Sequence, residues 1–256
     1  MAASSTSPST RILVWDLPTR LFHGLLALSV LGAFGVAVLV DDEGAAFPLH
    51  MLLGAVAAFL VALRVVWGFV GPRYARFRSF LFGPRAVSTY LKGVLHREAG
   101  ERHVGHNPGS SVIILVILAL TLGLALTGVS MSRGGESIKE VHEALAFSLV
   151  GVVALHVLGV VAHTLRHREN IARSMIDGRK DGDAAQAIPS AHPLVALALV
   201  GATALWTGVL VRGYDAGSRS VALPGLGSRI MLGEDERGKE HGGEGGPRER
   251  HEHDDD

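Results

Sequence analysis

Four histidines stand out, because their positions on long apolar stretches would let imidazole rings face one another. His142 and His156 lie 14 residues apart on one such stretch. At about 100° per residue, this spacing brings the second ring to within roughly 40° of the first, about 21 Å further along a helix axis. One helix face would therefore carry two imidazoles at two depths. His23 and His50 lie near the starts of two other apolar stretches.

Five apolar stretches are long enough to form helices that cross a membrane. They are residues 21–40, 49–70, 111–131, 145–165 and 193–211. Each is close to the roughly 20 residues that cross a hydrocarbon core about 30 Å thick. Apolar residues make up 48% of the 256 residues, and the strands of a membrane barrel would be shorter and alternating. We therefore expect an all-α integral membrane protein, in which the histidines are costly and point to function.

The charges between these stretches predict the side of the membrane on which each connection lies. Residues 71–110 hold seven Lys or Arg and two Glu, which places this connection in the cytoplasm by the positive-inside rule. Basic residues after position 165 place the end of the fourth stretch on the same side, and the acidic turn 41–43 faces the other side. The N-terminus is then cytoplasmic. Within the basic connection, residues 86–95 are expected to form a short interfacial helix.

In this topology the histidines form two pairs by depth. His23 and His156 lie toward the cytoplasm, and His50 and His142 lie toward the opposite side. Two imidazoles that approach a plane from opposite faces can ligate a low-spin b-type haem. The alternative for each position alone is an interhelical hydrogen bond or a place in the interface. The agreement in depth of four residues on three helices favours two haems stacked across the bilayer.

Other residue types limit how such a cofactor would be held. The chain has no cysteine, which excludes disulfides, thiolate-held iron–sulfur clusters and covalent attachment of a c-type haem. A haem would be held by coordination and packing alone. Glycines near the histidines would let a porphyrin approach the backbone: Gly24, Gly54, Gly151 and Gly159.

Two further side chains are candidate contacts for a cofactor near the cytoplasmic side. Arg64 would pair with a haem propionate or, alternatively, extend to the headgroup layer. His163 lies seven residues after His156 and would contact a propionate or a quinone head group. The alternative is that His163 is an interfacial histidine with its ring in the headgroup layer.

Several segments together give the chain a family resemblance. They are residues 14–23 (VWDLPTRLFH), 64–69 (RVVWGF), 71–77 (GPRYARF), 106–109 (HNPG) and the fourth stretch with His142-Glu143, His156, Arg168-Glu169-Asn170 and Met175. This ordered combination, spread over about residues 11–180, resembles the bacterial di-haem cytochrome b family. That family includes the b-type subunit of nickel-iron hydrogenases and bacterial cytochrome b561.

The resemblance implies two b haems with axial ligand pairs His23/His156 and His50/His142. It also implies electron transfer across the bacterial inner membrane between the quinone pool and a periplasmic redox partner, either a c-type cytochrome or a hydrogenase-like enzyme. The resemblance leaves open whether the chain itself has quinol oxidoreductase activity. One departure is Gly24, where the family often has tryptophan after the first ligand.

The domain organisation expected from these features places the haem-binding four-helix bundle in the middle of the chain. A cytoplasmic segment (1–20) precedes the bundle (21–180), and a linker (181–192) leads to a fifth transmembrane helix (193–211). The remaining residues, 212–256, are hydrophilic and are expected to be a disordered tail.

Two other classes of function fit parts of the sequence. A divalent-metal transporter or sensor would use the membrane histidines with the tail residues His241, His251 and His253. Three scattered histidines among acidic residues are more typical of a solvated segment. A passive membrane anchor for a partner enzyme would not need the pairing in depth. No feature of the sequence indicates nucleic-acid binding.

Overall fold

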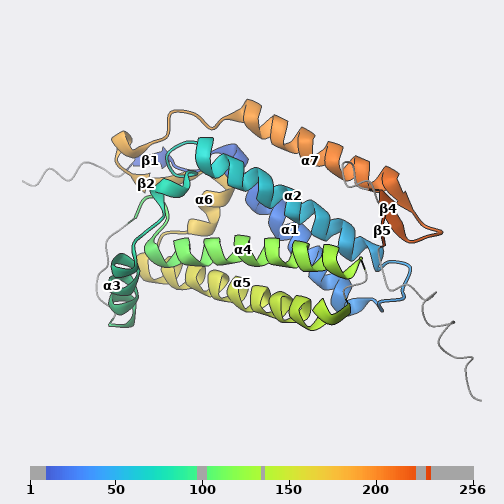
Figure 1. The fold of residues 1–256 in the computed structure, drawn as a ribbon. Coiled ribbons are helices and arrows are strands. Elements are labelled where there is room, and N and C mark those ends of the chain that lie inside the picture. The colour runs from blue at the N-terminus through green and yellow to red at the C-terminus, as the bar shows by residue number, and fades with distance from the viewer. Residues whose placement is uncertain (1–9, 97–102, 134–135, 223–228, 232–256) are drawn as a thin grey trace, which may run out of the picture.

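Five long helices lie side by side in the computed structural model, which describes residues 10–96, 103–133, 136–222 and 229–231. They are α1 (Leu17–Leu39), α2 (Pro48–Val70), α4 (Pro108–Met131), α5 (Lys139–His167) and α7 (Pro193–Gly213) (Figure 1). Each is long and apolar enough to span a membrane. The five stretches expected from the sequence correspond to these helices in order, so the all-α, multi-pass membrane architecture is confirmed.

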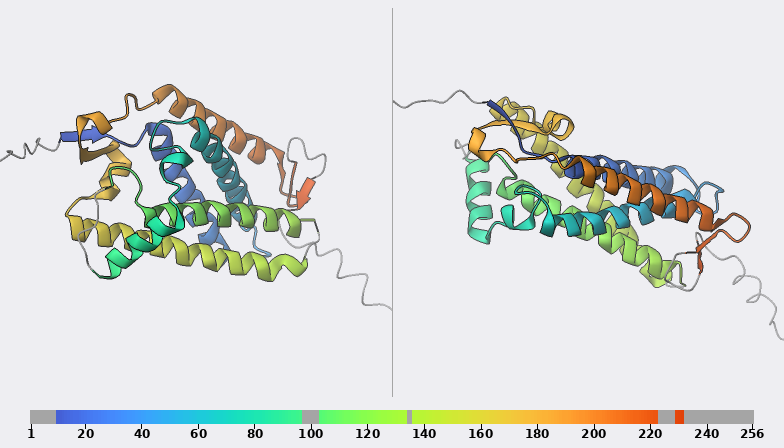
Figure 2. Two further views of the ribbon diagram at one scale, coloured as in Figure 1. Left: turned by 60° about the vertical axis from the view of Figure 1, so that its left-hand side comes forward. Right: turned by 90° about the horizontal axis from the view of Figure 1, so that it is seen from above.

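The long helices pack as two antiparallel pairs and one added helix. α1 packs against α2, and α4 packs against α5. α2 also contacts α4, and α7 covers α1 and α2. Figures 1 and 2 show α7 on the side of α1 and α2 that lies away from α5. The buried core joins α1, α2 and α4 through Phe22, Leu26, Ala57, Leu60, Val61 and Leu118.

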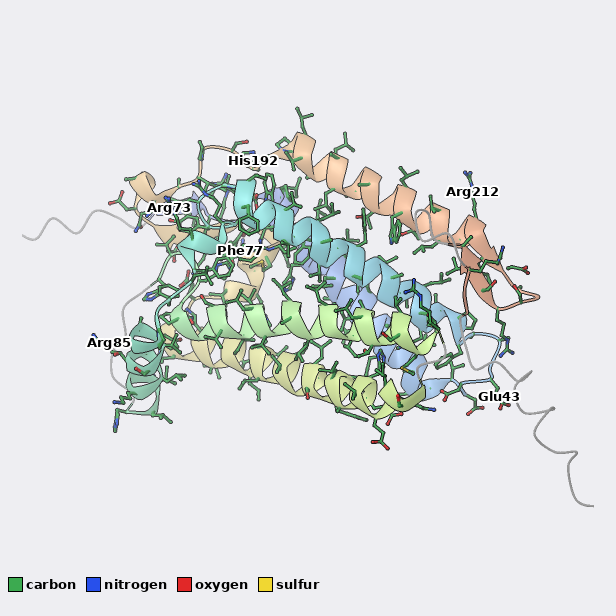
Figure 3. All side chains as sticks on the ribbon, in the orientation of Figure 1. Glu43, Arg73, Phe77, Arg85, His192 and Arg212 are labelled. Carbon is green, nitrogen blue, oxygen red and sulfur yellow. The ribbon has the colours of Figure 1, made fainter. Side chains whose placement is uncertain are left out.

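Short elements connect the long helices at both ends of the molecule. They are β1 (Thr10–Leu13), η1 (Phe77–Ser79), α3 (Pro84–Leu95), η2 (Glu136–Ile138), α6 (Ile171–Asp177), β2 (Arg179–Gly182), η3 (Ala184–Gln186), β3 (Tyr214–Asp215), β4 (Ser220–Ala222) and β5 (Arg229–Met231). β1 pairs antiparallel with β2, and β3, β4 and β5 form a second antiparallel sheet. Figure 3 labels Arg73 and Arg85 at one end of the molecule, called here the basic end. Glu43 and Arg212 lie at the opposite end, called the acidic-turn end.

Side-chain caps fix where two spans begin at the basic end. Asp16 accepts a hydrogen bond from the Thr19 backbone N–H at the start of α1, and Pro18 occupies the first turn. Asn107 and Ser110 form a reciprocal capping box at the start of α4. Both caps satisfy backbone donors that an uncapped helix end leaves unpaired.

The structure differs from the sequence expectation at the start of α5 and in the tail. α5 begins at Lys139, six residues before the expected start, because polar residues at the membrane surface continue the helix. Disorder from residue 212 onward was expected, but this is wrong for the strands β3 to β5. Val221 on β4 is buried against Leu210 of α7, and this apolar contact holds the sheet on the helix end. Residues 232–256, with the tail histidines, lie outside the described residues.

Candidate cofactor site

The four histidines meet as the two pairs expected from their depth. The ring centroids of His23 on α1 and His156 on α5 are 6.4 Å apart. The ring centroids of His50 on α2 and His142 on α5 are 6.1 Å apart. The first pair lies toward the basic end and is called the inner pair. The second lies toward the acidic-turn end and is called the outer pair.

These separations match the space that one metal ion needs between two imidazoles. Each metal–nitrogen bond is about 2 Å and each nitrogen lies about 1 Å from its ring centre, so the two centroids would be about 6 Å apart. Both pairs join α5 to the α1/α2 pair, so each potential centre would connect the two halves of the bundle. Each pair therefore has the spacing that two imidazoles need to ligate one metal ion between them.

Hydrogen bonds set the tautomer of both rings of the outer pair. His50 Nδ1 lies 2.8 Å from the Ala33 carbonyl oxygen, which only accepts hydrogen bonds. His142 Nδ1 lies 2.8 Å from Thr127 Oγ1. The Thr127 hydroxyl donates to the Gly123 carbonyl at 2.9 Å, so it accepts from His142. Each Nδ1 therefore carries a proton, and each Nε2 keeps the lone pair that a metal requires.

Three of the four glycines singled out in the sequence follow a histidine by one to four residues and lie beside space that the protein does not fill. A Cβ atom added at Gly24, Gly54 or Gly159 would meet no heavy atom within 4 Å. By contrast, a Cβ at Gly68 would lie 2.2 Å from Phe77, so that glycine serves close packing. The three open positions leave room for a flat ring beside the histidines.

Gly151 is also open but does not belong to this site. It lies nine residues after His142, which places it about 180° around the helix. The space beside Gly151 is therefore on the face of α5 that points away from the paired rings. A porphyrin beside the paired rings would therefore not approach the backbone at Gly151, contrary to the expectation from the sequence. Gly151 lies between the two histidines along the helix axis but on the opposite helix face.

Arg64 is buried beside the inner pair. Its side chain is only 4% exposed, so it does not extend to the headgroup layer as the alternative expectation required. Its guanidinium carbon lies 5.4 to 5.9 Å from the ring centroids of Phe22, Phe77 and Phe80. Within the described part of the chain, Arg64 Nη1 is buried and has no hydrogen-bond partner. A buried cation with an unused N–H is suited to an acidic group of a cofactor.

His163 lies one to two turns beyond His156 and faces a carboxylate. Its Nε2 is 3.8 Å from Glu169 Oε2, and the two side chains are 18% and 13% exposed. Glu169 reaches this position because the chain turns at Arg168, whose backbone has a positive φ of 52°. His163 is therefore part of a mostly buried polar cluster and not a ring extended into the headgroups.

His106 is a residue that the sequence reasoning used only within a family motif. Its ring lies between Trp15 and Phe80, with ring centroids 4.7 Å away on each side. Burial, together with the positive charges of Arg64 and Lys180, lowers the pKa of His106 to about 3. Its Nδ1 is buried without a hydrogen-bond partner among the described residues. The signal for this role was weak, because His106 precedes a span and its neighbours come from distant parts of the chain.

Among the residues that the structure describes, no three histidine, aspartate or glutamate side chains gather in a way that could hold a metal ion. Within the described residues, the histidines that face one another inside the bundle form the inner and the outer pair. A pair of imidazoles suits a metal cofactor whose own ring supplies the other ligands.

Comparison with known proteins gives one family and one relative. The family model described as prokaryotic cytochrome b561 matches residues 14–178. The chain is also similar to a probable Ni/Fe-hydrogenase B-type cytochrome subunit from Rhizobium leguminosarum bv. viciae. The two are 24% identical over 214 residues, which cover 66% of this chain and 88% of that protein. No solved structure matches the chain. The range matched by the family contains both histidine pairs and ends before α7.

Proposed function

Because the chain belongs to the prokaryotic cytochrome b561 family and is thus a membrane b-type cytochrome that transfers electrons, we propose that it holds two b haems between its paired histidines. The observation that carries this proposal is the 6.1 and 6.4 Å separation of the two ring pairs. His23 and His156 would ligate the inner haem, and His50 and His142 the outer haem. Bound haem supplies reversible one-electron transfer.

The chain's own residues would hold and orient these groups. The Ala33 carbonyl and the Thr127 hydroxyl would fix the outer histidine rings through Nδ1, so that Nε2 of each ring could ligate the metal. Arg64 would donate a charge-assisted hydrogen bond to a propionate of the inner haem. The 14-residue spacing on α5 would separate the two centres by about 21 Å along the helix. Electrons would thus have one acceptor near each side of the membrane.

The proposed orientation follows from the charges at the two ends. Residues 71–96 and 166–180 make the basic end cationic, so this end and the N-terminus would face the cytoplasm of a bacterial inner membrane. Quinone would then react near the inner haem, where Arg64 and His163 are the candidate contacts. The neutral, buried His106 lies in the same region. In that role the chain would act as a quinone or quinol oxidoreductase.

The outer haem would exchange electrons with a periplasmic redox partner. The relative from Rhizobium leguminosarum is described as a hydrogenase cytochrome subunit. A hydrogenase-like subunit or a c-type cytochrome would therefore dock at the acidic-turn end, where the outer pair lies. This places the partner beside His50 and His142, and the quinone at the opposite end.

Substituting one ligand of each pair tests the assignment. His156→Ala should reduce the haem content of the purified protein from two to one per chain and leave the outer centre intact, because His50 and His142 are unchanged. His142→Ala should remove the other haem and leave the inner one. Absorbance difference spectra of the reduced and oxidised proteins, with haem extracted and quantified, measure both losses. An unchanged spectrum in either variant would show that the pairing is wrong.

A further inference from the structure

Helix α3 has one apolar face and one polar face. At about 100° per residue, the side chains of Val87, Tyr90, Leu91 and Val94 fall within one arc of about 100°, with Leu95 at its edge. The opposite arc carries Arg85, Thr89, Lys92 and His96, and Ser88 lies at the boundary between the two faces. Leu91, Val94 and Leu95 are 50%, 47% and 79% exposed, so the protein itself leaves much of the apolar face uncovered.

The position of α3 in the fold indicates what lies next to its apolar face. α3 packs against α4, and a Cβ atom added at Gly109 would come within 2.7 Å of the Tyr90 ring. Gly109 is in the first turn of α4, where this span enters the membrane. Figure 1 shows α3 running across the direction of α4 and α5, at their basic end. A helix in this place and direction lies along the surface of the bilayer.

The charged residues of α3 and of the segment before it have a single sign. No Asp or Glu occurs between Glu43 and Glu98, whereas this interval contains Arg73, Arg76, Arg78, Arg85, Lys92 and Arg97 besides the buried Arg64. Within the described residues, Arg78, Arg85 and Lys92 form no ion pair with a carboxylate. A cationic surface at the headgroup level attracts anionic lipids.

We propose that α3 is an interfacial helix that binds anionic phospholipid. Its apolar face lies at the boundary between acyl chains and headgroups, as in other amphipathic surface helices. Arg85 and Lys92, on the polar face, contact lipid phosphates. Because α3 connects α2 to α4, this contact ties the junction between the two halves of the bundle to the membrane surface. The proposal rests on the position of the spans and does not depend on haem binding.

Cysteine labelling tests the placement of the apolar face, since the chain has no cysteine of its own. Leu91→Cys and Thr89→Cys, about 160° apart around the helix and both exposed in the protein alone, are placed in the full chain in lipid nanodiscs. A polar maleimide should label position 91 at least about tenfold more slowly than position 89, after correction for the rates in the denatured chain. Equal rates would overturn the proposal and indicate that the face is covered by something other than lipid.

Lipid selectivity tests the contribution of charge. Spin-labelled phosphatidylglycerol should associate with the protein more strongly than spin-labelled phosphatidylcholine. Arg85→Gln combined with Lys92→Gln should lower this preference by about fivefold or more, given the usual strength of a basic residue near an anionic surface. The matched control is Arg212→Gln with Arg219→Gln at the other end, and it should keep most of the preference.

No preference in the wild type, or an equal loss in both variants, would overturn the proposal. Haem spectra of the same samples report separately on the proposed function.

Discussion

At the scale of single residues, the outer histidine pair is oriented by two oxygen atoms of residues that would not themselves ligate the metal. The Ala33 carbonyl and the Thr127 hydroxyl each accept a hydrogen bond from an Nδ1–H, which leaves the Nε2 lone pair of each ring available to a metal. Partners of this kind raise the basicity of a ligand and hold its ring in place. Thr127 is the one that a substitution can remove.

Thr127→Val should weaken the outer haem without removing its ligands. The valine has the same shape but cannot accept the hydrogen bond from His142, so the haem affinity of this centre should fall about 10- to 100-fold. Titration of haem into the apoprotein measures this change. Thr121→Val is the matched control, because the Thr121 hydroxyl donates only within its own helix, to Ile117. Equal affinity in the two variants would argue against the orienting role of Thr127.

His106 gives the molecule a dependence of stability on pH. Burial, with the charges of Arg64 and Lys180, lowers the pKa of His106 to about 3, compared with 6.5 in the unfolded chain. Between these values the unfolded chain binds a proton that the folded chain does not. The stability associated with neutral His106 is therefore present above pH 6.5 and is lost as the pH falls toward 3.

His106→Phe should reduce this dependence, because phenylalanine can lie between Trp15 and Phe80 without a titratable group. The wild-type unfolding temperature should fall between pH 7 and pH 4, and it should fall less in the variant. The slope attributable to one proton is at most about 1.4 kcal/mol per pH unit. The exposed His96, changed to Gln, is the control and should follow the wild type. A variant as acid-sensitive as the wild type would contradict this account of His106.

At the scale of elements, the arrangement depends on which face of α5 each residue occupies. His142 and His156 lie toward α1 and α2, Gly159 lies about 60° from His156 around the helix, and Gly151 lies on the face opposite His142. α5 itself has few buried side chains, and its ring contacts with the other half of the bundle are the two histidine pairs and Phe147 with Phe34. The proposed haem sites therefore require open space beside the face of α5 that carries the histidines.

Gly159→Leu tests this requirement against Gly151→Leu. The Cβ atom of either leucine would meet no heavy atom of the protein within 4 Å. The leucine at 159 should lower the inner haem content by occupying the space of the ring, and the leucine at 151 should have no effect. Haem content per chain, measured for both variants at equal expression, distinguishes them. Similar haem content in the two variants would contradict the assignment of faces.

The elements themselves were largely predictable from the sequence. Five apolar stretches gave five helices, because a run of about 20 apolar residues has few other stable structures in a membrane. The extra turns at the start of α5 were missed, since polar residues can continue a helix outside the hydrocarbon region. Strands β3 to β5 were missed because each has only two or three residues and depends on a contact with α7.

The residues of the site were predictable to different degrees. The histidine pairing could be predicted from depth, because the position of a residue along a membrane-spanning helix gives its depth in the bilayer. Histidines at the same depth on neighbouring helices can then meet. The buried surroundings of Arg64 and His106 did not, since they come from residues such as Trp15 and Phe80 that are far away along the chain. Burial of this kind depends on how loops fold over the ends of helices.

At the scale of the whole molecule, two pairs of helices form an electron-transfer unit to which one further helix is added. α1 with α2 and α4 with α5 lie within the range matched by the cytochrome b561 family, and α7 lies outside it. α7 packs on the side of α1 and α2 away from α5, where it contacts α2 through Trp206 and Ala55. The proposed haem sites therefore involve no residue of α7.

The central claim is that two haems are held by two pairs of histidines, and the ratio of haem to chain tests it most directly. The purified full-length protein should contain two non-covalent b haems per chain, both low-spin with two imidazole ligands. Haem quantified as its pyridine complex, against protein measured by amino-acid analysis, gives this ratio, and electron paramagnetic resonance of the oxidised protein gives the ligation. A ratio that saturates at one haem per chain, or a high-spin iron, would contradict the account.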